Sequence, residues 1–346
     1  MALTMIPQQE IRDKNFDDFD ANGVNIMTKR VSGISISRYL TVLAALALMS
    51  PTLLAAQNNP LRIALLHWYT ANQAASFAVG NVPIHVAFDG SSIWVVNGND
   101  NTVKKLRASD GALLGTFAVG TGPFNLAFDG ANIWVTNNAS NNVTKLRARD
   151  GAVLGTFTVG TQPLSIAFDG SNVWVANGMG NTVTKLRAID GAVIGTFAVG
   201  ALPDGVAFDG SSIWVANDNA NTVTKLRARD GTVLGTFAVG SGPGELAFDG
   251  TNIWVSNFFS NTVTKLQASN GAVLGTFAVG TGPVGVAFDG ANIWVANDES
   301  NTVTALKASN GALVGTFKVG SHPEGIGFDG ANIWVANTVS NTLSKL

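Results

Sequence analysis

The chain of 346 residues is 13% charged, contains 39 glycines and no cysteine, and carries a formal net charge of −2. The lack of cysteine excludes disulfides, thiolate metal sites and cysteine nucleophiles, and the near-neutral charge excludes a general electrostatic attraction to nucleic acid or an anionic membrane. Hydrophobic residues make up 46% of the chain, which is ample material for a core.

The N-terminal segment has the pattern of a secretion signal. Basic residues between Lys29 and Arg38 precede an apolar run over residues 39–49, and small residues follow at positions 55 and 56. This run of eleven residues is shorter than the roughly 20 that a membrane-spanning helix needs. We therefore expect residues 1–56 to be an N-terminal extension and signal, and the protein to be periplasmic or secreted.

The position of the true start and of the cleavage site follows from the same segment. An acidic stretch precedes Met27, and a start at Met27 would give a signal of ordinary length. The mature chain would then begin near Gln57, with residues 57–75 as a linker and no membrane span. A buried or anchoring helix is the alternative interpretation of the apolar run.

Residues 76–346 contain a repeat of 40 residues. Each copy has four short segments rich in Val, Ile, Phe, Trp and Thr, separated by Asp-Gly, Asn-rich and Gly-x-Pro turns, which is the pattern of strands. In the fourth copy, strands are expected over 206–208, 213–216, 222–227 and 233–239. Four antiparallel strands per copy predict an all-β fold, a seven-bladed β-propeller of four-stranded blades. The repeated tryptophans, expected in the core between blades, are Trp94, Trp134, Trp174, Trp214, Trp254, Trp294 and Trp334.

The two ends of the repeat region predict how the ring closes. The last copy stops at Leu346, after its third strand, whereas residues 76–80 match the fourth strand of every other copy. An unpaired strand would leave an exposed edge on the last blade. We therefore expect the N-terminal strand 76–80 to complete the last blade.

The repeated pattern Pro-x-Gly-Val-Ala-Phe-Asp-Gly, Ile-Trp-Val-Ala-Asn and Asn-Thr-Val-Thr-Lys-Leu resembles the YVTN-type and virginiamycin B lyase-like propeller repeats, over roughly residues 76–346. Such repeats occur in lyases, in lactonases and in proteins without catalysis, so the resemblance implies the fold more firmly than an activity. For a lyase it implies Mg²⁺, a histidine directly after the repeat proline and a glutamate directly after the second-strand asparagine. Neither position holds those residues in any copy.

Variation among the copies is concentrated at one end of the ring. The loops between blades and the loops between second and third strands share this end, and variable loops on a rigid scaffold usually carry binding; neutral drift is the alternative. This face has no Lys or Arg, and its acids are Asp100, Asp204, Asp218, Glu245, Asp298, Glu299 and Glu324. Phe258 and Phe259 lie among them, and exposed aromatic rings beside acids suit a cation or a partly apolar partner. The alternative is that one ring folds back on its own blade.

Two functions remain open. The first is an exported, non-catalytic propeller, a monomer without a cofactor, that binds a ligand or protein through this face. Its candidate ligand-binding residues are Phe258, Phe259, Asp298, Glu299, Asp218, Asp204 and Glu245. The second is a metal-dependent enzyme, similar to virginiamycin B lyase or to a lactonase. It would use His85, His322 and Glu324, from neighbouring blades, as an acid–base or divalent-metal group.

The remaining charges are expected to have structural roles. The aspartates of the Asp-Gly pairs, such as Asp209, are expected to form turns. Lys and Arg recur two apart on the third strand, as in Lys225 and Arg227. We expect them to be solvated charges that protect strands against mispairing; a weak phosphate-contacting rim is the alternative.

Overall fold

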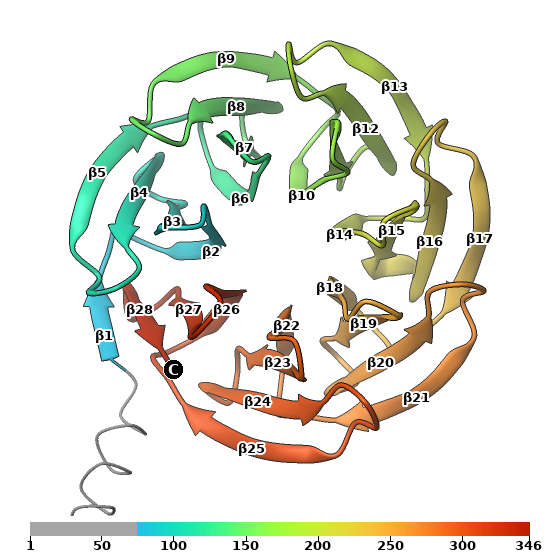
Figure 1. Ribbon diagram of the computed structural model, residues 1–346. Coiled ribbons are helices and arrows are strands. Elements are labelled where there is room, and N and C mark those ends of the chain that lie inside the picture. Colours follow the sequence, from blue (N-terminus) through green and yellow to red (C-terminus); the bar gives the residue numbers. More distant parts are fainter. Residues whose placement is uncertain (1–74) are drawn as a thin grey trace, which may run out of the picture. The chain divides into compact units, whose positions relative to one another are not determined.

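The computed structural model describes residues 75–346, which form seven four-stranded antiparallel sheets arranged as blades around a ring (Figure 1). This confirms the predicted all-β, seven-bladed propeller. The predicted signal, the Met27 start and nearly all of the linker lie outside the described residues. Between residues 75 and 346, no helix is long and apolar enough to cross a membrane.

Each blade runs from the centre of the ring to its rim. The innermost strands are β2 (Pro83–Phe88), β6 (Pro123–Phe128), β10 (Pro163–Phe168), β14 (Pro203–Phe208), β18 (Pro243–Phe248), β22 (Pro283–Phe288) and β26 (Pro323–Phe328). The second strands are β3 (Ser92–Asn97), β7 (Asn132–Asn137), β11 (Asn172–Asn177), β15 (Ser212–Asn217), β19 (Asn252–Asn257), β23 (Asn292–Asn297) and β27 (Ile333–Asn337).

The outer half of each blade follows in the same order. The third strands are β4 (Thr102–Arg107), β8 (Asn142–Arg147), β12 (Thr182–Arg187), β16 (Thr222–Arg227), β20 (Thr262–Gln267), β24 (Thr302–Lys307) and β28 (Thr342–Lys345). The rim strands are β5 (Leu113–Ala118), β9 (Val153–Thr158), β13 (Val193–Ala198), β17 (Val233–Ala238), β21 (Val273–Ala278), β25 (Leu313–Lys318) and β1 (Ala75–Ala78). One 3-10 helix, η1 (Asp218–Ala220), follows β15.

The ring closes as predicted, because β1 pairs antiparallel with β28 and completes the seventh blade (Figure 1). Phe77 of β1 packs on Trp334 with ring centroids 5.3 Å apart, as the corresponding rim phenylalanine does in every other blade. Two further contacts tie the seventh blade to the first. The Val82 N–H donates to Asn341 Oδ1 at 2.9 Å, and Lys345 Nζ donates to the Ala108 carbonyl at 2.8 Å.

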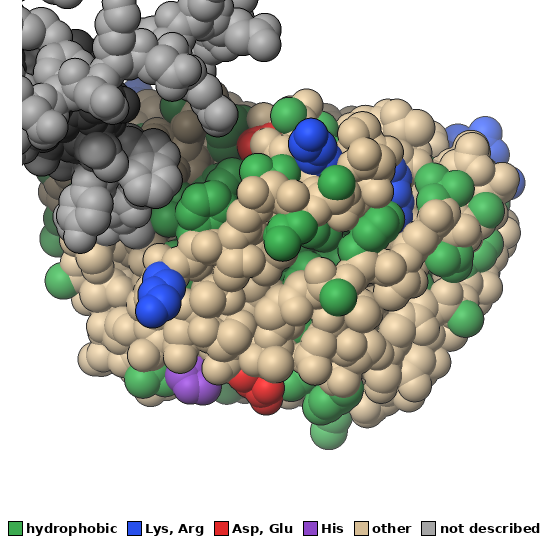
Figure 2. Space-filling view, turned by 90° about the horizontal axis from the view of Figure 1, so that it is seen from below, with side chains coloured by type: hydrophobic (Ala, Val, Ile, Leu, Met, Phe, Trp, Pro, Cys, Tyr) green, Lys and Arg blue, Asp and Glu red, His purple; other side chains and the backbone are tan. Residues whose placement is uncertain are grey.

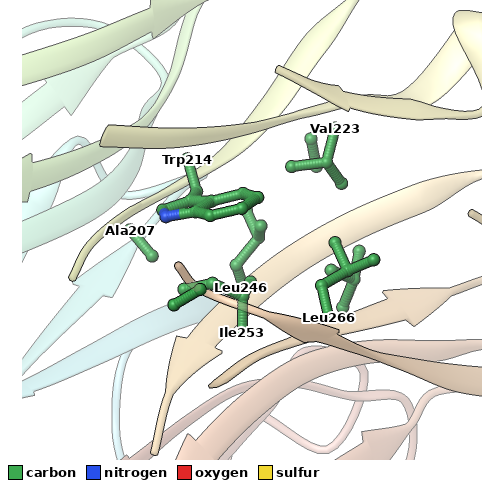
Figure 3. Close-up of a cluster of buried hydrophobic side chains, with 9 residues drawn as sticks. Ala207, Trp214, Val223, Leu246, Ile253 and Leu266 are labelled. Atoms are coloured by element: carbon green, nitrogen blue, oxygen red, sulfur yellow. The ribbon is translucent and has the colours of Figure 1, made fainter. Parts of the chain in front are cut away.

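The core lies between adjacent blades, as the tryptophans predict. Trp214 of the fourth blade is fully buried and packs against Leu246 and Ile253 of the fifth blade (Figure 3). The Asp-Gly aspartates form turns, as expected, and they also hold the tryptophans. Asp209 Oδ1 accepts the backbone N–H groups of Ser211 and Ser212, while its Oδ2 accepts Trp214 Nε1 at 2.8 Å. The same Trp–Asp bond occurs in all seven blades.

The expectation that the third-strand lysines are solvated is wrong. Lys225 is 7% exposed; its Nζ donates to the Ala268 carbonyl of the next blade at 2.6 Å and lies 4.9 Å from the centroid of the Trp214 ring. The physical reason is that side chains of a strand point to the faces of its sheet, and Lys225 lies opposite Trp214 on the face that packs against the next blade. The lysines therefore join blades and do not form a basic rim.

The innermost strands are irregular at a point that matters for the channel. In the fourth blade, the β14–β15 register shifts between Pro203 and Val206, so that Asp204 and Gly205 oppose no regular partner. Bulges of this kind redirect side chains. The equivalent two residues of each blade are the variable positions after the repeat proline, and they lie on the innermost strands, around the axis of the ring (Figure 1).

Candidate functional site

The loops at the variable end are held by buried asparagines. Asn217, at the end of β15, accepts the Gly200 N–H through Oδ1 at 3.0 Å and donates through Nδ2 to Thr224 at 2.9 Å. Asn221 accepts the Gly242 N–H of the next blade at 3.0 Å. These bonds fix the loops to the blades and the blades to each other, so the variable side chains project from a rigid frame.

One pocket lies at this end between the fourth, fifth and sixth blades. It has a volume of about 200 Å³. Its lining contains four of the predicted ligand-binding residues, and the full set is Asp204, Asp218, Gly242, Gly244, Phe258, Phe259, Pro283 and Val284. No Lys or Arg lines it. The structure thus brings acids from the fourth blade beside aromatic rings from the fifth.

The two phenylalanines form the outer wall of this pocket. Their rings meet edge to face with centroids 5.2 Å apart; Phe259 is 70% exposed, while Phe258 is half-buried. A Cβ atom on Gly242 would lie 2.5 Å from the Phe259 ring and 3.3 Å from Asp218 Oδ1, so both side chains lie over this bare glycine. Phe258 leans in the same way on Gly282. Phe259 therefore presents an aromatic surface beside a carboxylate.

A second group of side chains from several blades meets near the axis of the ring. Glu245, from the fifth blade, accepts a hydrogen bond of 2.9 Å from Asn125 Nδ2 of the second blade. His85 Nε2, from the first blade, lies 3.5 Å from the same Glu245 oxygen, and both side chains are almost buried, at 10% and 12% exposure. Asn125 Nδ2 also donates to Ser165 Oγ at 3.2 Å. Four blades thus contribute to one polar group inside the channel.

The buried acids have pKa values near neutrality. Burial raises the pKa of Glu245 to about 8, and repulsion from Asp204 adds to the rise. Burial raises the pKa of Asp204 to about 7, with Asp218 contributing. Burial, Asp298 and Asp204 together raise the pKa of Glu324 to about 8. Burial lowers the pKa of His85 to about 4, so this imidazole is neutral at pH 7.

His85, His322 and Glu324 do not form a single bonded group. His322 is exposed at the loop end, and its Nδ1 lies 3.1 Å from both carboxylate oxygens of Asp298. His85 contacts Glu245 instead, and it backs onto Gly325, next to Glu324. Among residues 75–346, no three His, Asp or Glu side chains are arranged to hold a metal ion. Glu299, a further predicted ligand-binding residue, is exposed beside Phe258 and Gly282.

Sequence reasoning missed the cross-channel group of Glu245, His85, Asn125 and Ser165. All four are the second residue after the repeat proline, and this shared position was the available signal. The fourth blade has Gly205 there, and a Cβ atom on Gly205 would collide with the Gly244 carbonyl, so the bare glycine lets the strand that carries Glu245 approach.

An edge-on view shows how charge divides between the two ends of the propeller. In Figure 2, a histidine and an acidic side chain appear at one end beside hydrophobic side chains, whereas the visible Lys and Arg lie mainly toward the other end. The candidate site, which is lined by Asp204 and Asp218 and by no Lys or Arg, is at the variable-loop end.

Comparison with solved structures shows the same fold in proteins of different activity. A virginiamycin B lyase from Staphylococcus aureus has 19% sequence identity and a TM-score of 0.68, with 79% of this chain and 98% of that chain covered. A streptogramin B lyase structure has 18% sequence identity and a TM-score of 0.68, with 79% of this chain and 96% of that chain covered. Hydrazine synthase of Kuenenia stuttgartiensis has 19% sequence identity and a TM-score of 0.67, with 77% of this chain and 95% of that chain covered. No protein-family model and no curated protein sequence matches the chain.

Proposed function

We propose that this protein is an exported, non-catalytic propeller that binds a compact organic cation, free or carried on a protein partner, at its acidic loop face. The observation that carries the proposal is the pocket in which Asp204 and Asp218 lie beside Phe258 and Phe259. Aromatic faces attract cations, and the attraction grows when the cation leaves water.

The size and charge of the pocket favour a small cation. Its volume of about 200 Å³ is below the 300–1,000 Å³ typical of sites for drug-sized ligands. Burial and the neighbouring Asp218 disfavour the charged form of Asp204. A bound cation would reverse this penalty, because an opposite charge at close range stabilises a carboxylate. Ligand binding would therefore be coupled to loss of a proton.

Tetramethylammonium is a suitable probe for this site, since it is compact and permanently charged. We expect calorimetry at pH 8 to show saturable binding of tetramethylammonium and none of neutral tert-butanol. The double variant Phe258→Ser, Phe259→Ser should keep its fold, because other blades have Gly178 and Met179 or Asp218 and Asn219 at these loop positions. It should lose the binding. Unchanged binding in the folded double variant, or unfolding of that variant, would refute the proposal.

A metal-dependent, virginiamycin B lyase-like enzyme is the second candidate. The observation in its favour is the contact between neutral His85 and Glu245, since a buried imidazole beside a carboxyl group suits acid–base chemistry. The likeness to lyase structures concerns the fold alone. Calorimetry with Mg²⁺, Mn²⁺ and Zn²⁺ separates the two candidates: micromolar, stoichiometric binding that His85→Ala abolishes would favour the enzyme.

A further inference from the structure

The contact between lysine and tryptophan is interrupted in one blade. In six blades, Nζ of the third-strand lysine lies 4.9–5.1 Å from the centroid of the tryptophan ring of its own blade. In the sixth blade, Ala305 is paired with Trp294 instead. The six other tryptophans of the ring are 0% exposed, whereas Trp294 is only partly buried. At Trp294 this lysine is absent and part of the indole is exposed, while Ala305 itself is 0% exposed.

The exception occurs beside the blade in which the ring closes. Each of the six lysines donates to a carbonyl in the turn that joins the third and fourth strands of the next blade, as Lys265 does to Ala308 at 2.7 Å. The next blade after the sixth is the seventh, whose third and fourth strands, β28 and β1, are not joined by such a turn. Within residues 75–346, no turn of this kind faces position 305.

The groups that remain at Trp294 still suit an ammonium ion. Asp289 Oδ2 accepts Trp294 Nε1 at 2.6 Å, so a carboxylate lies at the edge of the ring. In the first blade, the equivalent carboxylate of Asp89 lies 3.3 Å from Lys105 Nζ, which shows that this position can hold an ammonium. Phe317 supports the indole with ring centroids 5.3 Å apart.

We propose that the exposed part of the Trp294 indole is a binding site for a primary alkylammonium ligand about as long as a lysine side chain. The side chains of the six lysines show how such a ligand would bind. Its alkyl chain would lie along the blade, and its ammonium would lie over the indole and beside the carboxylate. The site is at the Asp-Gly turn end of the propeller, and it is independent of the cation pocket proposed above.

The test uses the full chain labelled with 5-fluorotryptophan, observed by ¹⁹F NMR, with the Trp294 resonance assigned from Trp294→Phe. We expect n-butylammonium to shift the Trp294 resonance saturably and to leave the resonances of the six buried tryptophans in place. Neutral n-butanol should cause a shift at least tenfold smaller at the same concentration. All samples are brought to the same ionic strength with NaCl, so that general salt effects do not contribute to the shifts.

Two variants provide matched controls. Ala305→Lys should fill the position from within and weaken the response of Trp294 to n-butylammonium at least tenfold. Lys225→Ala should open a second position and make the Trp214 resonance respond as well, because the Ala268 carbonyl is still available there. The double variant Phe258→Ser, Phe259→Ser should respond at Trp294 as the wild type does, which separates this site from the loop-face pocket.

The proposal is overturned if n-butanol and n-butylammonium shift Trp294 equally, or if n-butylammonium shifts no resonance. It is also overturned if Ala305→Lys folds and Trp294 responds in it as in the wild type. If Ala305→Lys does not fold, the Lys225→Ala variant provides the test. In that case a Trp214 resonance that does not shift with n-butylammonium overturns the proposal.

Discussion

Nε2 of His85 lies 3.5 Å from Oε1 of Glu245, although the two residues belong to the first and fifth blades and face each other across the channel. Burial holds the imidazole neutral at pH 7 and raises the pKa of the carboxyl group to about 8. Carboxyl groups near the loop face thus hold protons at neutral pH, and a bound cation would favour release of these protons to solvent. Stability and binding should both depend on pH for this reason.

The first prediction concerns stability between pH 6.5 and 8.5. Folding raises the pKa values of Glu245 and Glu324 to about 8, so in this window the folded chain holds protons that the unfolded chain has lost. Stability therefore falls as pH rises toward 8. His85, with its pKa lowered to about 4, changes its contribution only below about 6.5 and does not interfere.

Calorimetric melting curves measure this effect. We expect the Tm of the wild type to fall by several degrees between pH 6.5 and 8.5, and the Tm of the double variant Glu245→Gln, Glu324→Gln to fall less than half as far. Parallel curves for the two proteins would show that these carboxyl groups titrate normally.

The second prediction concerns the bond between Trp214 and Asp209. Asp209→Ala leaves the buried indole N–H without an acceptor and removes the oxygen that caps the turn. An unsatisfied buried donor costs about 1–3 kcal/mol, so denaturant unfolding should show a loss of at least that size. Asp230→Ala, which removes an exposed partner of Arg227 on the neighbouring turn, is the control and should cost clearly less. Equal losses would contradict the role assigned to the Trp–Asp bond.

The third prediction concerns closure of the ring. Deletion of residues 76–80 should lower the Tm by several degrees or cause aggregation, because β28 would become an exposed edge and Trp334 would lose Phe77. The point variant Phe77→Ala separates the two effects, since it keeps the strand and removes the ring. An unchanged melting curve after the deletion would contradict the observed closure.

The fourth prediction concerns export, which rests on residues outside the described part of the chain. Mass spectrometry of the mature protein from its native host should find an N-terminus near Gln57. Intact peptides from residues 1–26 in the cytoplasmic fraction would contradict both the signal and the start at Met27.

The repeat made the fold predictable, whereas the site was only partly so. The period of the tryptophans and the match of residues 76–80 to a rim strand were enough to predict seven blades and their closure. Asp218 and Phe259 were predicted to share a face because they occupy equivalent loops of adjacent blades, and the structure places both in one pocket.

Two features depended on packing that the repeat pattern does not express. The contact of Glu245 with His85 needs a side chain to reach across the ring, which the bulge after the repeat proline and the bare Gly205 permit. The burial of Lys225 depends on an acceptor 43 residues away in the next blade. The clue to it in the sequence was Ala305, which replaces the lysine in the blade before the one in which the ring closes.

The affinity for tetramethylammonium as a function of pH tests the cation pocket most directly. With the pKa of Asp204 at about 7, the ionised fraction of this carboxyl group rises about tenfold between pH 6 and pH 8. Calorimetry should therefore show an affinity about tenfold higher at pH 8, and Asp204→Asn should abolish most of the difference. An affinity that is the same at both pH values, or a pH dependence that persists in Asp204→Asn, would contradict cation binding at Asp204.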